Sequence, residues 1–443
     1  EIKKVGQDAL EKIRPSKELP GMGAARVSDA TLRAARAAEL PVPMQLTKGQ
    51  ASRGFEEQRF ERETAKLPEG EPLRQRFADQ NQQLLQNFDS FAEQTGAQKV
   101  GLRAVGEVVD APLVKKFNEA RTRVNQAYTK AETAGQMADP VDTVPLLQYI
   151  EDNRPASLNA PVLTSVEAAI KKLDPKGTGL LPLNEIEEIR KMAGRLATPG
   201  TPNMVYGIEV KKLIDGLTEG KGGPLYQQAR RMNENFSNEF KKAGVIDKLL
   251  SVKPGTNDRA VALEDVFKHA VLDGSLDDLR KVRRTLQIGA GEEGKQAYRE
   301  LQGATIEHMK DLITKNVQRD VRGNPIVSAA ELNKVVRTLD QDGKLDFLFG
   351  KKGAEQIRDV NTIAQDVLTS PPGSVNSSNT ASVLAGLLDV GLTYTTGLPI
   401  PIASATTYAV KKLRSNQLTN KVNKTLNYNA LAPQNQNALN TVP

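Results

Sequence analysis

Proline and glycine divide this chain into runs of helical periodicity, and this punctuation most limits what the chain can fold into. Within the runs, apolar residues recur every three or four positions, the spacing of one face of an α-helix, and strand-like alternation is nearly missing. Hydrophobic residues make up 38% of the chain and aromatic residues 4%. That composition suits helices that each bury one stripe. The sequence therefore predicts an all-α, elongated protein of several short helical bundles.

Apolar stripes and flanking breakers position the expected helices. One helix begins at Pro72, a favourable first-turn residue, and polar residues 80–83 interrupt its stripe. That stripe consists of Leu73, Phe77, Leu84, Phe88 and Phe91. Thr47 and Ser275 are candidate N-caps. The other helices are expected over residues 1–13, 29–39, 55–66, 113–131, 142–151, 161–173, 183–196, 204–218, 224–250, 260–272, 275–286, 293–320, 328–339 and 353–368.

The breakers also predict a division of the chain into six segments. The segments are an N-terminal helical arm and linker (1–45), a helical bundle (46–140), a short-helix region (141–222), a second helical bundle (223–372), an apolar helical hairpin (373–414) and a basic polar tail (415–443) that we expect to be disordered. The first residue is Glu1 rather than Met, so we expect the natural product to start further upstream. The opening residues are charged and do not resemble a secretory signal.

The hairpin segment differs most from the rest of the chain. Between residues 381 and 410 Asp389 is the one charged residue, and Pro399 and Pro401 forbid a continuous helix. Each arm is shorter than the ~20 residues that span a bilayer. One interpretation is a hairpin that enters a membrane or a subunit interface. The other is a helical pair buried in the protein's own core, because Asp389 is costly in lipid.

If the hairpin meets a membrane or another subunit, its apolar side chains make the contact. The candidates are Val383, Leu384, Leu387, Leu388, Val390, Leu392, Tyr394, Leu398, Ile400, Ile402, Tyr408 and Val410.

Basic residues are concentrated directly after the hairpin. The whole chain has 61 Lys and Arg against 54 Asp and Glu, a formal net charge of +7. Residues 411–443 contain no acidic residue, and their basic side chains are candidates for contact with the phosphates of lipid headgroups or of nucleic acid. The alternative is a solvated tail. The candidates are Lys411, Lys412, Arg414, Lys421 and Lys424.

Residue patterns typical of catalysis or metal binding are weak. Cysteine is absent, and the only histidines, His269 and His308, lack the spacing of a metal-binding pair. A stretch starting at Asp174 resembles a calcium loop, but Lys176 and Thr178 occupy positions that need oxygen ligands. We interpret that stretch as a turn. The sequence predicts no metal site, no cofactor and no catalytic residues.

One helix carries a compact basic cluster. Its residues are Arg280, Lys281, Arg283 and Arg284, preceded by Asp273, Asp277 and Asp278. Nucleic-acid contact is one interpretation. Ion pairs within the helix are the interpretation we favour, because the acids lie one or two turns earlier.

Two long runs of sequence resemble a known family. Residues 46–91, beginning LTKGQASRGFEEQRFERETAK, and residues 300–384, beginning ELQGATIEHMKDLITKNVQRDVRGNPIVSAAELNKVV, resemble segments of large virion proteins of tailed phages and prophages of Gram-negative bacteria. These are the internal virion, or DNA-ejection, proteins of short-tailed phages. Family members often have an upstream Gly/Ala-rich apolar region, which this chain lacks. Some carry a transglycosylase domain, and none is recognisable here.

The resemblance implies a role and no catalytic site. It implies storage inside the virion, ejection at infection, and assembly as a homo-oligomeric conduit for DNA in the host periplasm and inner membrane. The implied partners are other copies of the chain, other ejection proteins, portal or tail proteins, double-stranded genomic DNA bound without sequence preference, and the host membrane. Two alternatives remain: a static core or portal-associated protein that is never ejected, and a peptidoglycan-degrading enzyme, which the lack of a placed pair of carboxylates disfavours.

Overall fold

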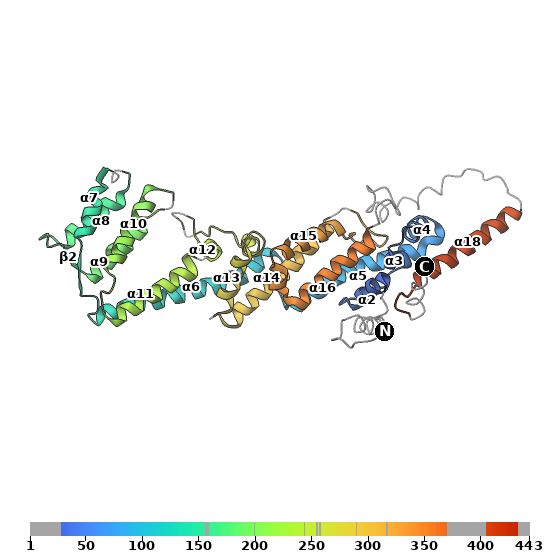
Figure 1. Cartoon of the computed structure of the whole chain (residues 1–443), viewed down its shortest axis with the longest axis horizontal. Coiled ribbons are helices and arrows are strands. Elements are labelled where there is room, and N and C mark those ends of the chain that lie inside the picture. Colours follow the sequence, from blue (N-terminus) through green and yellow to red (C-terminus); the bar gives the residue numbers. More distant parts are fainter. Residues whose placement is uncertain are drawn as a thin grey trace, which may run out of the picture. The chain divides into compact units, whose positions relative to one another are not determined.

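The computed structural model describes residues 28–155, 159–198, 200–242, 244–253, 256, 258–288, 290–315, 318–369 and 405–432, the last range with side chains from residue 415 onward. Helices dominate these residues, which confirms the all-α prediction. The chain divides into two compact units. Unit 1 is Glu1–Asp110 together with Val261–Pro443, and unit 2 is Ala111–Ala260. Figure 1 labels their elements in chain order.

Unit 1 is built from helices contributed by both ends of the chain. Its elements are α2 (Asp29–Glu39), α3 (Lys48–Ser52), α4 (Phe55–Ala65), η1 (Pro68–Gly70), α5 (Glu71–Thr95), the start of α6 (Leu102–Thr133), η4 (Leu263–Asp265), η5 (Lys268–Leu272), α13 (Leu276–Gln287), α14 (Gly291–Thr314), α15 (Ala329–Gln341), α16 (Lys344–Leu368) and α18 (Ala405–Leu426).

Unit 2 continues α6 and adds shorter elements. These are β1 (Pro140–Asp142), α7 (Val144–Asp152), α8 (Pro161–Leu173), β2 (Leu180–Pro182), α9 (Leu183–Leu196), α10 (Pro202–Leu217), α11 (Pro224–Phe236), η3 (Ser237–Lys241) and α12 (Val245–Leu250).

The core of unit 1 joins helices that are far apart in the sequence. Helix α5 packs against α14, and α15 packs against α16. One apolar cluster contains Leu84 and Phe88 of α5, Met309 of α14, Leu332 of α15 and Ile357 of α16, all almost completely buried. Burying each such side chain stabilises a fold by about 1.5–3 kcal/mol. Unit 1 is therefore closed by residues more than 200 positions apart.

The core of unit 2 consists of α8, α9 and α10, which pack against one another beside a short antiparallel ribbon of β1 and β2. In that ribbon Val141 lies opposite Leu181. Tyr226 is fully buried, and its hydroxyl donates to the buried Glu187 carboxylate at 2.5 Å. This bond satisfies a charge that would otherwise be costly to bury.

Aromatic rings join α6 to the helices that follow α10. The rings of Phe117, Phe236 and Phe240 lie with their centroids 5.2 to 5.5 Å apart. Such spacing adds favourable edge and offset contacts to the burial of the rings. A second core is therefore built around α6, α11 and η3.

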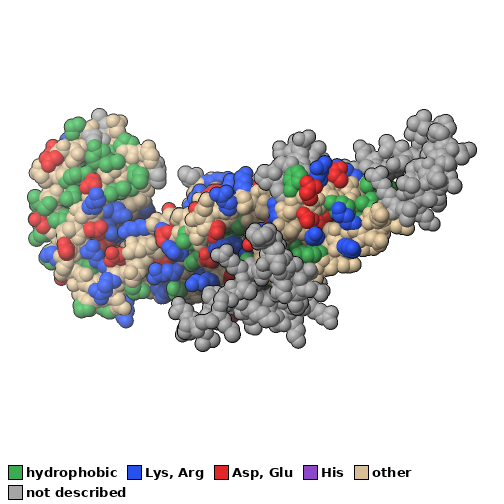
Figure 2. All heavy atoms as spheres, turned by 45° about the vertical axis from the view of Figure 1, so that its right-hand side comes forward, with side chains coloured by type: hydrophobic (Ala, Val, Ile, Leu, Met, Phe, Trp, Pro, Cys, Tyr) green, Lys and Arg blue, Asp and Glu red, His purple; other side chains and the backbone are tan. Residues whose placement is uncertain are grey.

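The surface of unit 2 carries exposed apolar side chains. In Figure 2 hydrophobic side chains are visible over this unit, at the left of the view. The exposed large hydrophobic residues of unit 2 include Val144, Leu173, Leu180, Met204, Val205 and Ile208. Val205 is the most exposed of these, at 61%.

The helix predicted over 224–250 is wrong as one continuous element. Helix α11 ends at Phe236, and a wider π-type turn follows in which the Lys242 N–H donates to the Ser237 carbonyl at 2.8 Å. Gly244 then adopts φ 61°, a backbone region that favours glycine, before α12 begins. Apolar spacing alone hides such a break, because the stripe continues on both sides of it.

Other predicted bounds also change. Residues 260–272 form two short turns, η4 and η5, rather than one helix. Helix α14 ends at Thr314 and not near Asp320. Helix α16 starts at Lys344 and crosses a kink at Gly350, whose φ of 69° a residue with a side chain would adopt only with strain. By contrast, the helix expected over 29–39 is confirmed at both ends.

The compact units follow other boundaries than the six segments expected from the sequence. Residues 46–140 contribute to both units, and residues 223–372 do as well. The expected disorder from residue 415 is wrong for residues 415–426, because α18 continues through residue 414 to Leu426. Most of the hairpin, residues 373–404, and the end of the tail lie outside the described residues.

Candidate functional site at helix α3

Helix α3 is a short helix with an unusually complete set of hydrogen bonds at its start. The Thr47 side chain accepts from the Gln50 N–H, and the Gln50 side chain accepts from the Thr47 N–H, which together form a capping box. Thr47 also donates its hydroxyl proton to Glu61 at 2.7 Å, and the Gly49 N–H donates to the same carboxylate at 2.6 Å. The predicted Thr47 cap is therefore confirmed.

Glu61, on α4, is a buried carboxylate with two strong donors. Burial raises its pKa to about 7, although the bonds from Thr47 and Gly49 favour the ionised form. The contact leaves no space for a side chain at Gly49, because a Cβ there would lie 2.8 Å from the Glu61 carboxylate and 2.9 Å from the Gln58 nitrogen. Glycine at position 49 thus follows from the closeness of α4.

Two buried glutamines extend this polar cluster to α5. The side chains of Gln50 and Gln80 bond to each other at 2.7–2.8 Å, and Gln80 also donates to the Gln45 carbonyl at 2.9 Å. Gln58 of α4 donates to the Gly49 carbonyl at 3.0 Å. Because buried polar groups need partners of definite geometry, these bonds specify how α3, α4 and α5 fit together.

Arg53, at the end of α3, binds the last turn of α16. It has a left-handed backbone with φ 56°, and its guanidinium donates to the carbonyls of Gln365, Asp366 and Thr369 at 3.0–3.3 Å. These carbonyls have no partner within a helix that ends there, and a cation at this end is favourable. Arg53 therefore fixes the point at which α16 ends and the apolar segment begins.

A shared carboxylate strengthens the same junction. Asp366 lies 3.8 Å from Arg53 and 3.7 Å from Arg33 of α2. Burial raises the pKa of Asp366 despite these two cations, and burial lowers the pKa of Arg53. The charges of this group are therefore paired in a partly dehydrated environment, where the loss of one partner is costly.

The helix that follows the apolar segment also returns to this region. On α18, Val422 is fully buried and Leu426 nearly so, against Ala65 and Leu73, with Phe60 packed alongside. The Lys421 ammonium lies 4.1 Å from the centre of the Phe60 ring, a cation–π geometry. Helix α18 also contacts α3 and η1.

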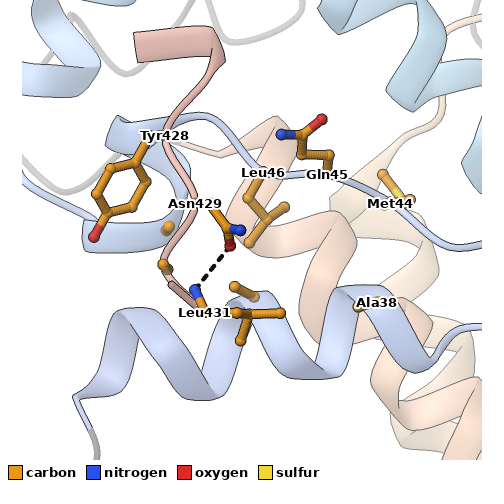
Figure 3. A pocket seen from close by; sticks show the side chains of 10 residues that line it. Ala38, Met44, Gln45, Leu46, Tyr428, Asn429 and Leu431 are labelled. Carbon is orange, nitrogen blue, oxygen red and sulfur yellow. Dashed lines mark hydrogen bonds between the residues drawn. The ribbon is translucent and has the colours of Figure 1, made fainter. Parts of the chain in front are cut away.

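Residues 427–432 continue from α18 across α2. The Thr31 hydroxyl donates to the Ala430 carbonyl at 3.2 Å, and the Leu431 N–H donates to the Asn429 side chain at 3.0 Å (Figure 3). A partly open cavity of about 240 Å³ lies beneath them. Its lining residues are Ala34, Ala38, Met44, Gln45, Leu46, Ala51, Tyr428, Asn429, Ala430 and Leu431.

Helix α3 is thus the common anchor of both ends of the apolar segment. Arg53 holds the end of α16, where residue 369 precedes the segment, and α18 contacts α3 after it. The two sequence runs that carry the family resemblance also meet here and nearby. Asn81, from the first run, bonds to Asp320, Pro325 and Val327 of the second at 3.0 Å each.

The structure describes few of the predicted contact residues. Those from Val383 to Ile402 lie outside the described residues, and Tyr408, Val410, Lys411, Lys412 and Arg414 lie on α18 with undescribed side chains. Lys421 contacts Phe60, and Lys424 is exposed. Their contact with phosphate or lipid stays a prediction. Among the helices of the described residues, none is both long and apolar enough to cross a membrane.

Three weaker sequence features receive a local explanation. In the calcium-like loop both Asp174 oxygens accept from the loop itself, from the Thr178 hydroxyl and the Gly179 N–H. His269 pairs with Asp273 at 3.2 Å. Burial beside the Phe267 ring lowers the pKa of His308.

The basic cluster on α13 turns to partners within unit 1. Lys281 pairs with Asp277 at 3.0 Å, as the ion-pair interpretation expects. The Arg283 guanidinium stacks on the rings of Tyr298 and Phe347, with distances of 5.2 and 5.0 Å. Within the described ranges, no three His, Asp or Glu side chains converge as metal ligands would.

The sequence analysis missed most of the residues that build the anchor. Glu61, Gln80, Arg53 and Asp366 were not singled out, because charged and amide side chains are usually exposed. One signal was available. Polar residues on the apolar face of a helix, such as Gln80 and Asn81 in α5, are expected to have buried partners.

Comparisons with family models, with curated proteins and with solved structures find no match to this chain.

Proposed function

We propose that this chain is an internal virion protein of a short-tailed phage, ejected into the host envelope, where copies assemble into part of a conduit for the genome. The proposal rests on the sequence resemblance and gains support from one observation. The two resembling runs build a single anchor that holds both ends of the apolar segment 370–404. A chain organised in this way can present an apolar segment while its own fold stays intact.

The chemistry of the segment suits this role. Residues 381–404 contain one charged residue, Asp389, and α18 continues with Lys411, Lys412 and Arg414. Apolar residues next to cations are the combination that binds an anionic membrane surface. The conduit and the other partners (other ejection proteins, portal or tail proteins, and DNA) follow from the resemblance. The proposal assigns no catalytic residue, metal or cofactor to the chain.

Liposome flotation of the full chain tests the proposal. The key variant replaces residues 376–404 with a Gly/Ser linker of equal length, which leaves the docking residues Val422 and Leu426 in place. We expect the unmodified chain to float with anionic vesicles at low and at physiological salt, and the variant to lose flotation at physiological salt. Headgroup attraction alone is screened over ~8 Å at that salt, so persistence requires apolar insertion.

A matched control keeps the segment and replaces Lys411 and Lys412 with glutamine. This control should lose flotation only partly, because the apolar residues remain. A full chain that stays unbound in every condition would contradict the proposal.

A static virion protein is the second candidate, and the packing of Val422, Leu426 and Ala430 on unit 1 favours it. In that case the segment serves assembly, and the linker variant should reduce the yield of particles rather than their infectivity. Counting particles and infectious units from the same lysate separates the two roles.

A further inference from the structure

A second cavity lies beside α5, away from the apolar segment, and its lining is polar. Its volume is about 370 Å³, whereas a water molecule takes about 30 Å³. The lining residues are Pro43, Gln45, Arg76, Asp79, Gln82, Gln83 and Gln86. One cation, one carboxylate and four amides therefore surround a space large enough for a small ligand.

Arg76 is the residue of this cavity whose bonding is incomplete. Its Nη1 atom is buried and has no hydrogen-bond partner. Burial lowers the pKa of Arg76, and Asp79 is the acid that opposes this effect. A guanidinium carries five N–H donors and gains most from an oxyanion that accepts two of them.

Asp79 does not neutralise Arg76 alone, because it is already engaged. Its carboxylate lies 2.7 Å from the Arg322 guanidinium, which comes from the turn before α15. Arg322 also donates to Gln75 and Gln82 at 3.1 and 3.3 Å. Two guanidinium groups thus share one carboxylate, and the rim of the cavity keeps one net positive charge.

The bond from Arg322 also orients one of the amides. Because the Gln82 oxygen accepts from Arg322, its NH₂ group stays free to donate elsewhere. Gln45 and Gln83 are held through their backbones, whose carbonyls accept from Gln80 at 2.9 Å and from Asn87 at 2.8 Å. The cavity therefore has a positive charge with positioned neutral donors around it, the combination that binds an anion.

We propose that this cavity is a binding site for a small oxyanion, a phosphate or carboxylate group, with Arg76 as its charge partner and the glutamine amides as further donors. The site does not rest on the ejection proposal, since none of its residues contacts the apolar segment's anchors through Arg53 or α18. An oxyanion here completes the bonding of Arg76 and offsets the cost of burying its charge.

Isothermal titration calorimetry of the full chain at low ionic strength tests the site. The probes are inorganic phosphate, acetate and a deoxynucleoside monophosphate, with chloride at equal ionic strength as the reference. We expect one of these oxyanions to bind with one site per chain and chloride not to compete. Equal affinity for phosphate and nucleotide identifies free phosphate as the ligand class, tighter nucleotide binding identifies a nucleotide, and binding of acetate alone identifies a carboxylate.

Two substitutions locate the binding. Arg76→Gln should weaken it at least about tenfold, since a charge-assisted hydrogen bond is lost. Arg59→Gln, which removes an equal charge from an exposed position on α4, should leave the affinity unchanged. Gln83→Ala, which keeps the charge, should weaken binding several-fold and serves if Arg76→Gln does not fold. Failure of all three probes to bind, or an affinity unchanged by Arg76→Gln and Gln83→Ala, would overturn the proposal.

Discussion

The two units begin their helices in different ways. In unit 1, side chains accept hydrogen bonds from first-turn N–H groups at Ser28, Thr47, Ser275 and Ser328. In unit 2 the helices α7, α8, α10 and α11 have no such cap, and a proline stands in their first turn at Pro145, Pro161, Pro202 and Pro224. A cap stabilises the folded helix, whereas a proline restricts the unfolded chain.

The cores differ in the same sense. The buried charged and amide residues of unit 1 include Gln50, Gln58, Glu61, Gln80, Asn81, Asn87, Glu300, Asp320 and Lys344. In unit 2 the described residues of this kind are Lys116 and Glu187. Unit 1 therefore depends on hydrogen bonds that accept one geometry only, and unit 2 depends mainly on apolar packing. The region that anchors the apolar segment belongs to the unit with the more exacting core.

Removing an aromatic ring from unit 2 should have the largest effect. Phe240→Ala deletes a buried ring that contacts Phe117 and Phe236. We expect a loss of about 4 kcal/mol in the free energy of unfolding of unit 2, from lost burial and the remaining cavity. Hydrogen exchange of peptides from each unit measures this. Phe55→Ala, at an exposed position, is the control, and equal losses in both units would contradict the comparison.

The next effect is a pH dependence confined to unit 1. Burial raises the pKa of Glu61 from 4.5 to about 7, so the folded chain binds this proton more tightly than the unfolded chain. The resulting stabilisation is fully present below about pH 4.5 and is lost as the pH rises to about 7. The free energy of unfolding should therefore fall by up to about 3 kcal/mol across this window.

Comparison with Glu61→Gln isolates that contribution. Burial also raises the pKa of Asp359, to about 6, so the unmodified chain titrates at more than one group. The variant keeps Asp359 and should lose only the part of the slope due to Glu61. Urea unfolding at pH 5, 6, 7 and 8 provides the measurement. Parallel curves for the two proteins would show that Glu61 does not titrate here.

A smaller loss should follow when one amide of the unit 1 core is replaced by an apolar side chain of similar size. Asn81→Leu leaves the Val327 N–H, the Pro325 carbonyl and the Asp320 carboxylate without a partner. We expect about 2 kcal/mol of destabilisation despite the added hydrophobicity. Leu163→Asn is the converse change in the apolar core of unit 2. Thermal unfolding of both variants would weaken the comparison if Asn81→Leu proved neutral.

The helix starts give the smallest effects. Ser275→Ala removes the capping box of α13 and should cost about 1 kcal/mol. Pro202→Ala, at the start of α10, should cost about 0.4–1 kcal/mol through the unfolded state. Unfolding kinetics distinguish the two mechanisms, because the proline change should act mainly on the folding rate. A Pro202→Ala change that speeds unfolding instead would contradict this account.

The sequence predicted the helices well where breakers mark their ends. The helix expected over 161–173 matches α8, and that over 183–196 matches α9. It failed where the apolar stripe continues through a break, as at Ser237–Lys241 and Gly244. It also failed for unit 1 as a whole, because apolar periodicity shows which face of α5 is buried but not that α14 covers it.

The candidate site was predictable only in part. The pattern Thr47 to Gln50 is a local signal, since both partners lie in one turn. Arg53 and Asp366 are more than 300 positions apart, and their pairing depends on how α3 meets α16. Local sequence carries no information on such a meeting. The interrupted stripe of α5 was recognised, but its polar residues were interpreted as a gap and are instead buried.

The discontinuity of unit 1 has a consequence for synthesis on the ribosome. The apolar stripe of α5 is made more than 200 residues before α14, the helix that covers it. At about 5–20 residues per second, that interval is roughly 10–40 s. Unit 2 is completed within the interval. The nascent chain thus carries Leu84 and Phe88 uncovered while its middle is already folded, and α5 is the segment where a chaperone would bind first.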